Sequence, residues 1–410
     1  MAPDGWEFKK LEDLCRPNAP ITYGVLKPGE FYQGGIPLLQ IKDLRDGCVL
    51  TDDLHLISPA LDEEYKRSRI LKNDILISLV GTIGRIAKYS GDSAANIHRN
   101  IGRIRSDCHE YLYYFLTSNC AQNEIGGSSS GSSQSALNLS TLRSMKIPTP
   151  PLAEQKKIAQ ILATWDKAIT TTEQLIAISK QQKKALMQQL LTGKKRLRDK
   201  NEVRFSGEWK TTTLGQIGEI KSAGVDKKIV EGETPVRLLN FTDVFKRSFI
   251  YSNELNHWVT APESKVSGCD VRLGDVFFTP SSETKDEAGI PAVAAEDIRN
   301  CCYSYHVVRF RIREQWDLNF KAYAFTTPEF RKQVDQLADG SGQRYVVSQN
   351  AFRSISITYP SYDEQIAIGR TLRIAEDEIK IFQKKLCYLK QEKKALMQQL
   401  LTGKRRVQIN

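Results

Sequence analysis

Three side chains in the second half of the chain have the types and spacing of a metal-dependent nuclease. Asp275, Glu283 and Lys285 form an acidic pair plus a lysine that could hold a metal ion. The first half has an aspartate at the matching place, Asp74, but Leu79-Val80-Gly81 follows it, with no Glu-x-Lys. Because only the aspartate is common to both halves, we interpret it as a structural turn residue and predict no catalytic residue in this chain.

Other sequence signals of enzymatic activity are missing. An adenine methyltransferase would carry an Asn/Asp-Pro-Pro-aromatic motif, and Asn18-Ala19-Pro20 and Tyr359-Pro360 are not equivalents. Gly193-Lys194 lacks the upstream glycine of an ATP-binding loop. The eight cysteines include no Cys-x-x-Cys pair, and Cys108-His109 alone cannot form a metal site. The sequence therefore predicts free thiols, no metal and no cofactor in this chain.

Side chains that suit DNA recognition recur in equivalent loops of the two halves. Arg and Lys pair with guanine, Asn and Gln pair with adenine, and cations bind phosphates. Any one of these residues could be an ordinary solvated residue, but recurrence in both halves favours the set. The candidates in the first half are Gln40, Lys42, Thr82, Arg85, His98, Arg99, Asn100, Ser133 and Gln134. Those in the second half are Asn240, Thr242, Ser281, Ser282, Lys285, Tyr305, His306, Gln343, Arg344 and Tyr345.

The charge of the chain agrees with a polyanionic partner. The formal net charge is +11 and the sequence pI is about 9.1, while the hydrophobic content of 40% is ordinary for a globular protein. Such a balance most often indicates nucleic acid binding. A merely basic soluble protein is the alternative. The Gly/Ser segment 126–135 is interpreted as a flexible loop that closes over DNA.

These candidate residues need elements to position them, and an exact internal repeat defines those elements. The string KKALMQQLLTGK occupies 183–194 and recurs at 393–404, 210 residues later. Twelve identical positions do not arise by chance in a chain of this length. The chain is therefore two copies of one unit, each ending in the same helical segment.

A long helix is predicted after Pro151, because Pro suits a first helical turn and Gly193 suits the end. No Gly or Pro lies between them, and the apolar positions step alternately by three and four, as in a coiled coil. At ~1.5 Å per residue such a helix is roughly 60 Å long. Its predicted seam consists of Leu162, Trp165, Ile169, Thr172, Ile176, Ser179, Lys183, Leu186 and Leu190.

The second copy has a seam in the same register. Each of its positions lies 210 residues after its counterpart, so we expect the two helices to pack together antiparallel. The alternative is that each helix packs only on its own domain. The second seam consists of Leu372, Ala375, Ile379, Phe382, Leu386, Leu389, Lys393, Leu396 and Leu400.

The fold class that follows is α+β. We expect two mixed α/β domains, made of short strands, joined by two long antiparallel coiled-coil helices with pseudo-two-fold symmetry. The helical parts of the two copies are nearly identical and their globular parts differ, as expected for a shared scaffold that carries two different recognition domains. The predicted boundaries are a first domain at 1–150, a central helix at 151–195, a basic linker at 196–208, a second domain at 209–359, a C-terminal helix at 360–404 and a tail at 405–410.

No signal-peptide-like run and no stretch of 18 or more apolar residues occurs in the sequence. We therefore expect a cytoplasmic protein without a membrane partner.

With these features the chain resembles the specificity subunit of type I restriction-modification systems. Both long helices open with a Pro-x-x-Glu-Gln-like segment and close with the repeated string; the segments are Pro151, Glu154, Gln155 and Pro360, Glu364, Gln365. The segment LISLVGTIG, residues 76–84, resembles that family's first-domain pattern. The second domain departs from it, since TPSSETKDEAG at 279–289 replaces the Gly-x-x-Gly turn.

The resemblance implies a non-catalytic DNA reader. Each target-recognition domain would read one half of a bipartite, asymmetric double-stranded DNA site, and the paired helices would fix the gap and bind two methyltransferase subunits. Two restriction translocase-nuclease subunits would join the full complex. S-adenosylmethionine, ATP and Mg would then be cofactors of those partners and not of this chain.

Two other functions remain open at this point. The chain could be a coiled-coil scaffold whose end domains bind proteins without DNA sequence specificity. It could also serve a related system in which one polypeptide both cuts and methylates. The recognised base sequence and the spacer length cannot be predicted from the sequence, because they depend on side-chain geometry and DNA shape.

Overall fold

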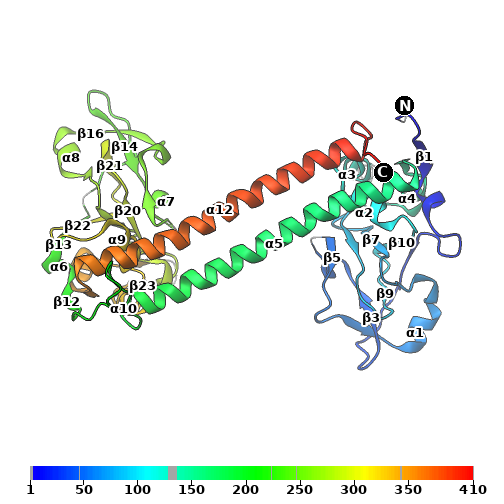
Figure 1. The fold of residues 1–410 in the computed structure, drawn as a ribbon, viewed down its shortest axis with the longest axis horizontal. Coiled ribbons are helices and arrows are strands. Elements are labelled where there is room, and N and C mark those ends of the chain that lie inside the picture. The colour runs from blue at the N-terminus through cyan, green and yellow to red at the C-terminus, as the bar shows by residue number, and fades with distance from the viewer. Residues whose placement is uncertain are drawn as a thin grey trace. The chain divides into compact units, whose positions relative to one another are not determined.

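The structure is a computed structural model that describes residues 3–45, 47–127, 136–222, 224–245, 247–341 and 344–409. The chain divides into two compact units, unit 1 (residues 1–173 and 384–410) and unit 2 (residues 174–383). Helices α5 (Leu152–Leu190) and α12 (Tyr362–Leu400) each begin in one unit and end in the other. Each unit therefore consists of one globular domain and one end of both long helices (Figure 1).

The domain of unit 1 is built on a mixed sheet with the strand order β2-β10-β7-β8-β5-β4. A second sheet, β6-β3-β9, and a two-stranded ribbon of β1 with β11 accompany it. The apolar run Ile75–Ser78 is buried at every position, which explains why it forms the inner strand β7. The strands are β1 (Glu7–Lys10), β2 (Thr22–Tyr23), β3 (Ile36–Leu39), β4 (Leu44–Arg45), β5 (Gly47–Val49), β6 (His55–Ile57), β7 (Ile75–Ser78), β8 (Ile86–Lys88), β9 (Asn96–Ile97), β10 (Ile101–Ile104) and β11 (Lys146–Thr149). The helices of this domain are α1 (Pro59–Glu64), α2 (His109–Thr117), α3 (Asn119–Gly127) and α4 (Leu139–Ser144).

The domain of unit 2 repeats this topology. Its main sheet has the order β13-β22-β18-β20-β15, its second sheet the order β16-β14-β21-β17, and β12 pairs with β25. A further small sheet, β19-β24-β23, has no counterpart among the described strands of unit 1. The strands are β12 (Lys210–Thr213), β13 (Gly218–Lys221), β14 (Thr234–Leu239), β15 (Phe249–Ile250), β16 (Trp258–Ala261), β17 (Asp270–Val271), β18 (Val276–Phe278), β19 (Ser281–Ser282), β20 (Pro291–Ala294), β21 (Ile298–Tyr303), β22 (Val308–Ile312), β23 (Asp339–Ser341), β24 (Arg344–Val346) and β25 (Ser356–Tyr359). The helices are α6 (Leu214–Ile217), α7 (Phe241–Val244), α8 (Glu263–Gly268), α9 (Leu318–Ala324), α10 (Pro328–Leu337) and α11 (Gln349–Ser354).

Both long helices end in the same way because the repeated string specifies the same termination. Gly193 and Gly403 follow α5 and α12, and each has φ +69°. A left-handed residue at this place satisfies the last helical carbonyl groups, and only glycine adopts it without strain. Gly193 N–H donates to Leu190 O, and Gly403 N–H donates to Leu400 O, each at 3.3 Å.

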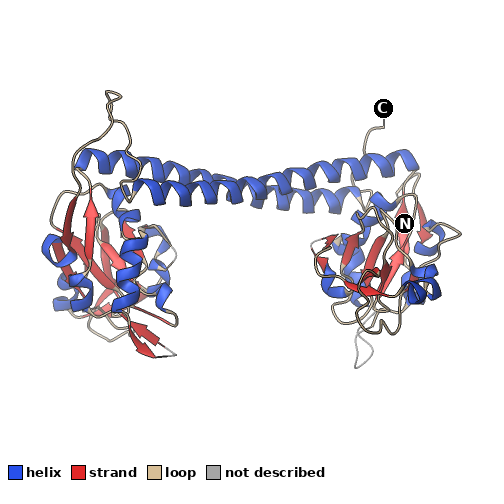
Figure 2. Cartoon of the chain, turned by 90° about the horizontal axis from the view of Figure 1, so that it is seen from below, coloured by secondary structure: helices blue, strands red, loops and turns tan. Residues whose placement is uncertain are grey.

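In each unit, α5 and α12 pack antiparallel and share a core with the domain. In unit 1, Ile158 and Leu162 of α5 lie in one buried cluster with Leu400 and Leu401 of α12. In unit 2, residues 190 and 191 near the end of α5 lie in one cluster with Ile368 and Leu372 of α12. Figure 2 shows the strands of each unit gathered on one side of this helix pair. The predicted α+β fold with paired antiparallel helices is confirmed, and packing of each helix on its own domain alone is wrong.

Two lysines of the predicted seams, Lys183 and Lys393, form charged pairs with the opposite helix. Lys393 of α12 bonds Asp166 of α5 at 2.5 Å, and Tyr114 donates to the same carboxylate at 2.8 Å. The counterparts in unit 2 are Lys183 and Glu376, at 2.9 Å, with Tyr323 donating to Glu376 at 2.8 Å. A polar pair inside an apolar seam fixes the register of two helices, because any shift leaves charges unpaired.

Candidate nucleic-acid interface

In unit 1, the loops that follow β2, β3, β7 and β9 are joined by short backbone hydrogen bonds. The parallel pairing of β3 with β9 brings the carboxyl ends of both strands to one edge of their sheet. We call residues 24–25, 39–42, 79–85 and 98–100 the first turn cluster. The bonds are Val25 N to Ile97 O (2.8 Å), His98 N to Leu39 O (2.9 Å), Leu79 N to Asn100 O (2.8 Å) and Leu137 N to Leu79 O (2.7 Å).

Unit 2 has the same arrangement with different side chains. Here β14 pairs in parallel with β21, and Pro280 stands where Leu79 stands in unit 1, so the bond donated by the Leu79 N–H has no equivalent. We call residues 224–225, 239–242, 280–285, 305–306 and 344–347 the second turn cluster. Its bonds are Val225 N to Tyr303 O (3.0 Å), Ser304 N to Leu239 O (2.9 Å) and Val347 N to Pro280 O (2.8 Å).

The structure places the described candidates of the first half in or beside the first turn cluster. Lys42, Thr82 and Arg99 are exposed, whereas Gln40, Arg85, His98 and Asn100 are half-buried. Ser133 and Gln134 lie outside the described residues. Exposed amide, hydroxyl and guanidinium groups on adjoining turns are the groups that contact base edges and phosphates.

Arg85 has a structural role that its sequence did not indicate. Its Nη1 donates to Ile41 O at 3.3 Å and to Leu44 O at 3.0 Å. These bonds hold the short 3-10 helix η2 (Ile41–Asp43), which carries Lys42, against the turn after β7. Part of the Arg85 guanidinium therefore positions a neighbouring candidate residue.

The described candidates of the second half divide into exposed and buried groups. Thr242, Lys285, Tyr305 and Arg344 are exposed, Ser282, His306 and Tyr345 are half-buried, and Asn240 and Ser281 are buried. Asn240 donates through Nδ2 to Leu238 O at 3.1 Å, which indicates that it shapes the turn from inside. Gln343 lies outside the described residues.

Pairing of β19 with β24 brings several of these residues together. Arg344 Nη2 donates to Ser281 Oγ at 3.1 Å, and Lys285 Nζ lies 5.3 Å from the centroid of the Tyr345 ring. Short antiparallel ribbons of this kind can enter a DNA groove with alternate side chains directed at the bases. The ribbon thus presents cationic and aromatic groups on one small sheet.

The electrostatic environment of His306 is positive. Burial lowers the pKa of His306, and the charges of Lys227 and Arg344 lower it further. Burial and then the neighbouring Arg99 lower the pKa of His98 in the same direction. Both imidazoles are therefore neutral near pH 7, able to donate from one nitrogen and accept at the other. Lys227 was missed by the sequence reasoning, because nothing in its local sequence separates it from the neighbouring Lys228.

Each of the two shared aspartates is bound by an arginine, which agrees with a structural role. Asp74 receives hydrogen bonds from Arg105 Nε and Nη2 at 2.7 and 2.6 Å. Asp275 receives the equivalent pair from Arg311, both at 2.7 Å. Both carboxylates are almost fully buried. With both oxygen atoms of Asp275 bound to a guanidinium, the nuclease-like reading of Asp275, Glu283 and Lys285 has no support in this geometry.

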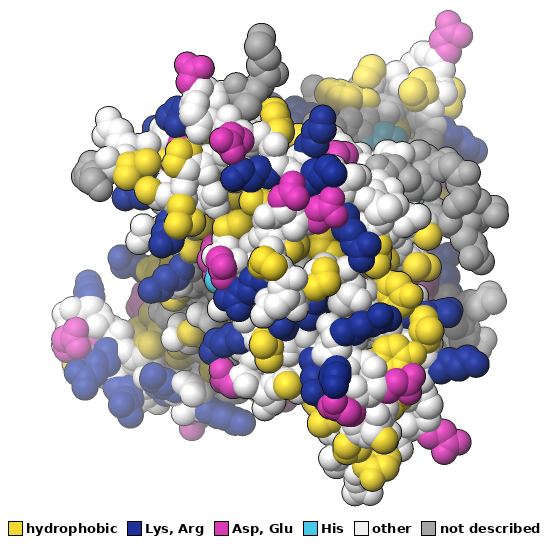
Figure 3. Space-filling view, turned by 90° about the vertical axis from the view of Figure 1, so that its right-hand side faces the viewer, with side chains coloured by type: hydrophobic (Ala, Val, Ile, Leu, Met, Phe, Trp, Pro, Cys, Tyr) yellow, Lys and Arg dark blue, Asp and Glu magenta, His cyan; other side chains and the backbone are white. Residues whose placement is uncertain are grey.

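No group of three or more His, Cys, Asp or Glu side chains that could hold a metal ion occurs within the described ranges. The same part of the chain has no helix long and apolar enough to cross a membrane. Lys and Arg side chains are spread over the face shown in Figure 3, among exposed hydrophobic side chains. The described surface chemistry is thus that of a basic protein with many separate cations.

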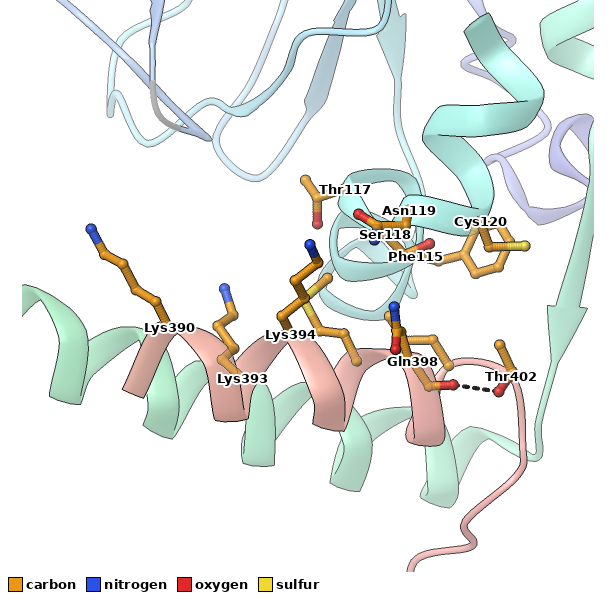
Figure 4. Close-up of a pocket in the computed structure, with 12 residues that line it drawn as sticks. Phe115, Thr117, Ser118, Asn119, Cys120, Lys390, Lys393, Lys394, Gln398 and Thr402 are labelled. Atoms are coloured by element: carbon orange, nitrogen blue, oxygen red, sulfur yellow. Dashed lines mark hydrogen bonds between the residues drawn. The ribbon is translucent and has the colours of Figure 1, made fainter. Parts of the chain in front are cut away.

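The repeated string lines a cavity in unit 1. The cavity has a volume of about 220 Å³ and lies between the end of α12 and the junction of α2 and α3. Lys390, Lys393 and Lys394 extend from α12 toward the side on which Thr117 and Asn119 lie (Figure 4). Two of these cations are neutralised, since Lys390 pairs with Glu173 at 2.7 Å and Lys393 with Asp166. We assign the cavity no ligand.

Comparison with known proteins agrees with these features. Residues 3–180 match the family model of the type I restriction modification DNA specificity domain. The type I restriction enzyme EcoBI specificity subunit of Escherichia coli is 34% identical over 164 residues, which cover 39% of this chain and 35% of that relative. The type I restriction enzyme MjaVIII specificity subunit of Methanocaldococcus jannaschii is 26% identical over 424 residues, covering 99% of this chain and 94% of that relative.

Solved structures share the fold over nearly the whole chain. The HsdS subunit of Thermoanaerobacter tengcongensis superposes with a TM-score of 0.53 at 17% identity, covering 99% of this chain and 98% of that one. The type I restriction-modification S subunit of M. genitalium gives a TM-score of 0.55 at 16% identity, covering 96% of each chain. Residues 3–180 thus match the type I restriction modification DNA specificity domain, and nearly the whole chain is similar in sequence to a type I specificity subunit and shares the fold of solved ones.

Proposed function

We propose that this chain selects the DNA sequence on which a type I restriction-modification assembly acts. Each domain reads one half of a bipartite, asymmetric duplex site. The observation that carries this proposal is the turn cluster, which occurs twice with three equivalent backbone hydrogen bonds and different exposed side chains. A repeated frame with changed side chains is what two readers of different base sequences need.

The paired helices act as the spacer between the two readers. Helices α5 and α12 are 39 residues long each, or about 58 Å at ~1.5 Å per residue. Register is held by the partly buried pairs Lys393–Asp166 and Lys183–Glu376. A spacer with a fixed register sets the number of base pairs between the half-sites.

Binding to DNA is expected to be dominated by phosphates before the bases are read. The net charge of +11 and the exposed Lys42, Arg99, Lys285 and Arg344 supply the cations. Each phosphate contact releases counterions, so the affinity falls steeply with salt. Specific affinity then depends on the turn clusters.

The repeated string and the outer faces of the helices bind the catalytic partners. Lys184, Gln188 and Gln189 of the first string are exposed, as are Lys394, Gln398 and Gln399 of the second. Packing within the chain does not require identical residues at exposed positions, whereas recognition of two copies of one partner does. We infer that the partners are two methyltransferase subunits.

The outer face of α12 in unit 2 supports helix docking. Ile374 and Ile381 are 60% and 65% exposed and lie seven residues apart, on one face of the helix. Glu376, about 200° round the helix from Ile374, faces the domain through Tyr323, so the two isoleucines point away from it. Leu175 and Ile178 of α5 are also exposed, at 38% and 50%. An exposed apolar face of heptad spacing suits a helix of another subunit.

Chemistry is assigned to the partners. The methyltransferase subunits would use S-adenosylmethionine to methylate adenine, and two translocase-nuclease subunits would use ATP and Mg. This chain contributes specificity and no catalytic residue. A partner that both cuts and methylates in one polypeptide would bind the same surfaces, the repeated strings and the outer faces of the helices. Identification of the co-purifying subunit distinguishes this partner from a separate methyltransferase.

The proposal is tested by mapping methylated adenines in DNA modified by the full complex. A bipartite motif is expected, and exchange of residues 1–150 for another such domain should change one half-site only. Methylation or cleavage by the purified chain alone, with cofactors supplied, would contradict the non-catalytic assignment. Binding of labelled duplex without any sequence preference would instead support the scaffold alternative.

A further inference from the structure

Each domain has a loop with exposed apolar side chains that begins at the first residues of its turn cluster. In unit 1 this loop, residues 24–35, carries Leu26, Phe31 and Tyr32, which are 45%, 60% and 50% exposed. In unit 2 the loop at residues 224–233 carries Ile229 and Val230, which are 80% and 47% exposed. Several large apolar side chains exposed within one short loop mark an interaction site.

Both loops begin at the same place in the fold. Val25 bridges to His98 in parallel, and Val225 bridges to Ser304 in the same way. Gly24 permits this contact, because a Cβ there would lie 1.6 Å from Ile97 O. A Cβ at Gly224 would lie 2.2 Å from the carbonyl carbon of Ser304. The close approach ties each loop to the turn that carries candidate reading residues.

The far ends of both loops are also tethered to neighbouring segments by backbone N–H groups. In unit 1, Tyr32 N–H donates to Leu56 O at 2.9 Å and Gly35 N–H donates to Tyr32 O at 3.0 Å. In unit 2, Val230 N–H donates to Thr260 Oγ1 at 2.7 Å. Exposed apolar side chains grouped on a tethered loop at the same place in both domains indicate that a ligand covers them.

The charges beside these side chains point to DNA as that ligand. Lys27 follows Leu26, and Lys227 and Lys228 precede Ile229, and all three lysines are exposed. The charge of Lys227 acts on His306 of the second turn cluster. Cations beside apolar wedges are the composition with which proteins bind phosphates and insert between base steps.

We propose that the loops 24–35 and 224–233 are a second set of DNA-contacting elements, whose lysines bind phosphates and whose apolar side chains, chiefly Phe31 and Tyr32, pack against or between bases beside the half-sites. This inference rests on the proposed DNA-reading function. It adds contacts that stabilise and bend the duplex without reading the bases that the turn clusters read.

The test uses the full chain with its methyltransferase subunits and a duplex that carries the mapped site. The double variant Phe31→Ala, Tyr32→Ala should lower the affinity about tenfold and reduce the bend measured by energy transfer between dyes at the duplex ends. The salt dependence and the methylated motif should not change, because no charge and no base-reading group is removed. Phe8→Ala, at an apolar residue of β1 that is 52% exposed, is the matched control.

Two further measurements keep the outcome decisive. The swap Phe31→Tyr, Tyr32→Phe keeps both rings and should retain the wild-type affinity and bend. Unchanged affinity and bend in the double alanine variant, or loss of methyltransferase binding in place of DNA binding, would overturn the inference. If the wild-type complex shows no sequence preference, the proposed function fails. If the wild-type complex has a sequence preference but the double alanine variant keeps the wild-type affinity and bend, only the inference about the loops fails.

Discussion

Arg406, just beyond the end of α12, forms a two-point ion pair with Glu154 in the first turn of α5. Arg406 Nε donates to Glu154 Oε1 at 2.7 Å, and Nη2 donates to Oε2 at 2.8 Å. Glu154 is only 1% exposed and also accepts from Trp6 Nε1 at 3.1 Å. In unit 2, Arg196 makes the same pair with Glu364, at 2.6 Å for both bonds. The Glu of each Pro-x-x-Glu-Gln-like segment thus receives an arginine that follows the other copy's helix.

We predict that Arg406→Ala destabilises unit 1. The change leaves the carboxylate of Glu154 buried and still bonded by Trp6 but without its cationic partner, and a buried charge without its partner is strongly unfavourable. A melting temperature several degrees lower is expected in thermal unfolding followed by circular dichroism. Arg405→Ala, at the exposed neighbouring arginine, should leave the transition unchanged. Equal transitions for both variants would contradict the role of this pair.

Glu376 is predicted to make unit 2 sensitive to acid. Burial acts to raise the pKa of Glu376, but the charge and hydrogen bond of Lys183 outweigh it, with Lys380 and Tyr323, and the pKa falls from 4.5 to about 2. Because the pKa is lower in the folded state, the carboxylate stabilises the fold above pH 4.5, and this contribution is lost as the pH falls toward 2.

Urea unfolding between pH 6 and pH 3 measures this effect. Glu376→Gln should lower the free energy of unfolding at pH 6 by roughly 3–5 kcal/mol, the range for removal of one partner of a buried pair. In this variant the free energy of unfolding should also decrease less below pH 4.5 than it does in the wild type. The exposed Glu378→Gln on the same helix is the control and should keep the wild-type pH profile.

Arg344→Ala is predicted to affect one half-site. Arg344 is exposed on β24, where it bonds Ser281, and the change leaves unit 1 untouched. Loss of a base-edge contact should weaken binding roughly 5- to 100-fold and relax the preference at the bases read by the second domain. Mapping of methylated adenines measures this. Arg353→Ala, at an exposed arginine of α11, should alter neither half-site.

The two partner copies are predicted to bind with unequal affinity. Ile374 and Ile381 correspond, 210 residues earlier, to Thr164 and Thr171, which are exposed as well. Threonine buries less apolar surface against a docking helix, so Ile374→Thr, Ile381→Thr should weaken one site about tenfold or more. Thr164→Ile, Thr171→Ile should strengthen the other. Native mass spectrometry of this chain titrated with methyltransferase subunits measures both affinities through the ratio of complexes with one and with two methyltransferase subunits. Equal ratios in all variants would refute the prediction.

The candidate site was only partly predictable. Lys42, Thr82, Arg99, Lys285, Tyr305 and Arg344 are exposed on adjoining turns, as DNA-reading residues need to be. Asn240 and Ser281 are buried, and Arg85 is partly engaged by backbone carbonyl groups. Residue type and loop position cannot separate these cases, because burial depends on strands from distant parts of the chain.

The sequence by itself determined the features that local spacing controls. Repeated strings, the three-and-four step of apolar residues, and glycines at 193 and 403 specify two long helices with identical ends. Backbone sterics and helical periodicity act over a few residues, so these features can be read from the string.

Only the tertiary structure decided which distant residues meet. It packs the string at 393–404 against the first domain, pairs Arg406 with Glu154, and brings Arg344 to Ser281. The physical reason is that these contacts form between segments far apart in sequence. Their partners are selected by the packing of whole sheets and helices, for which no short stretch of sequence carries a signal.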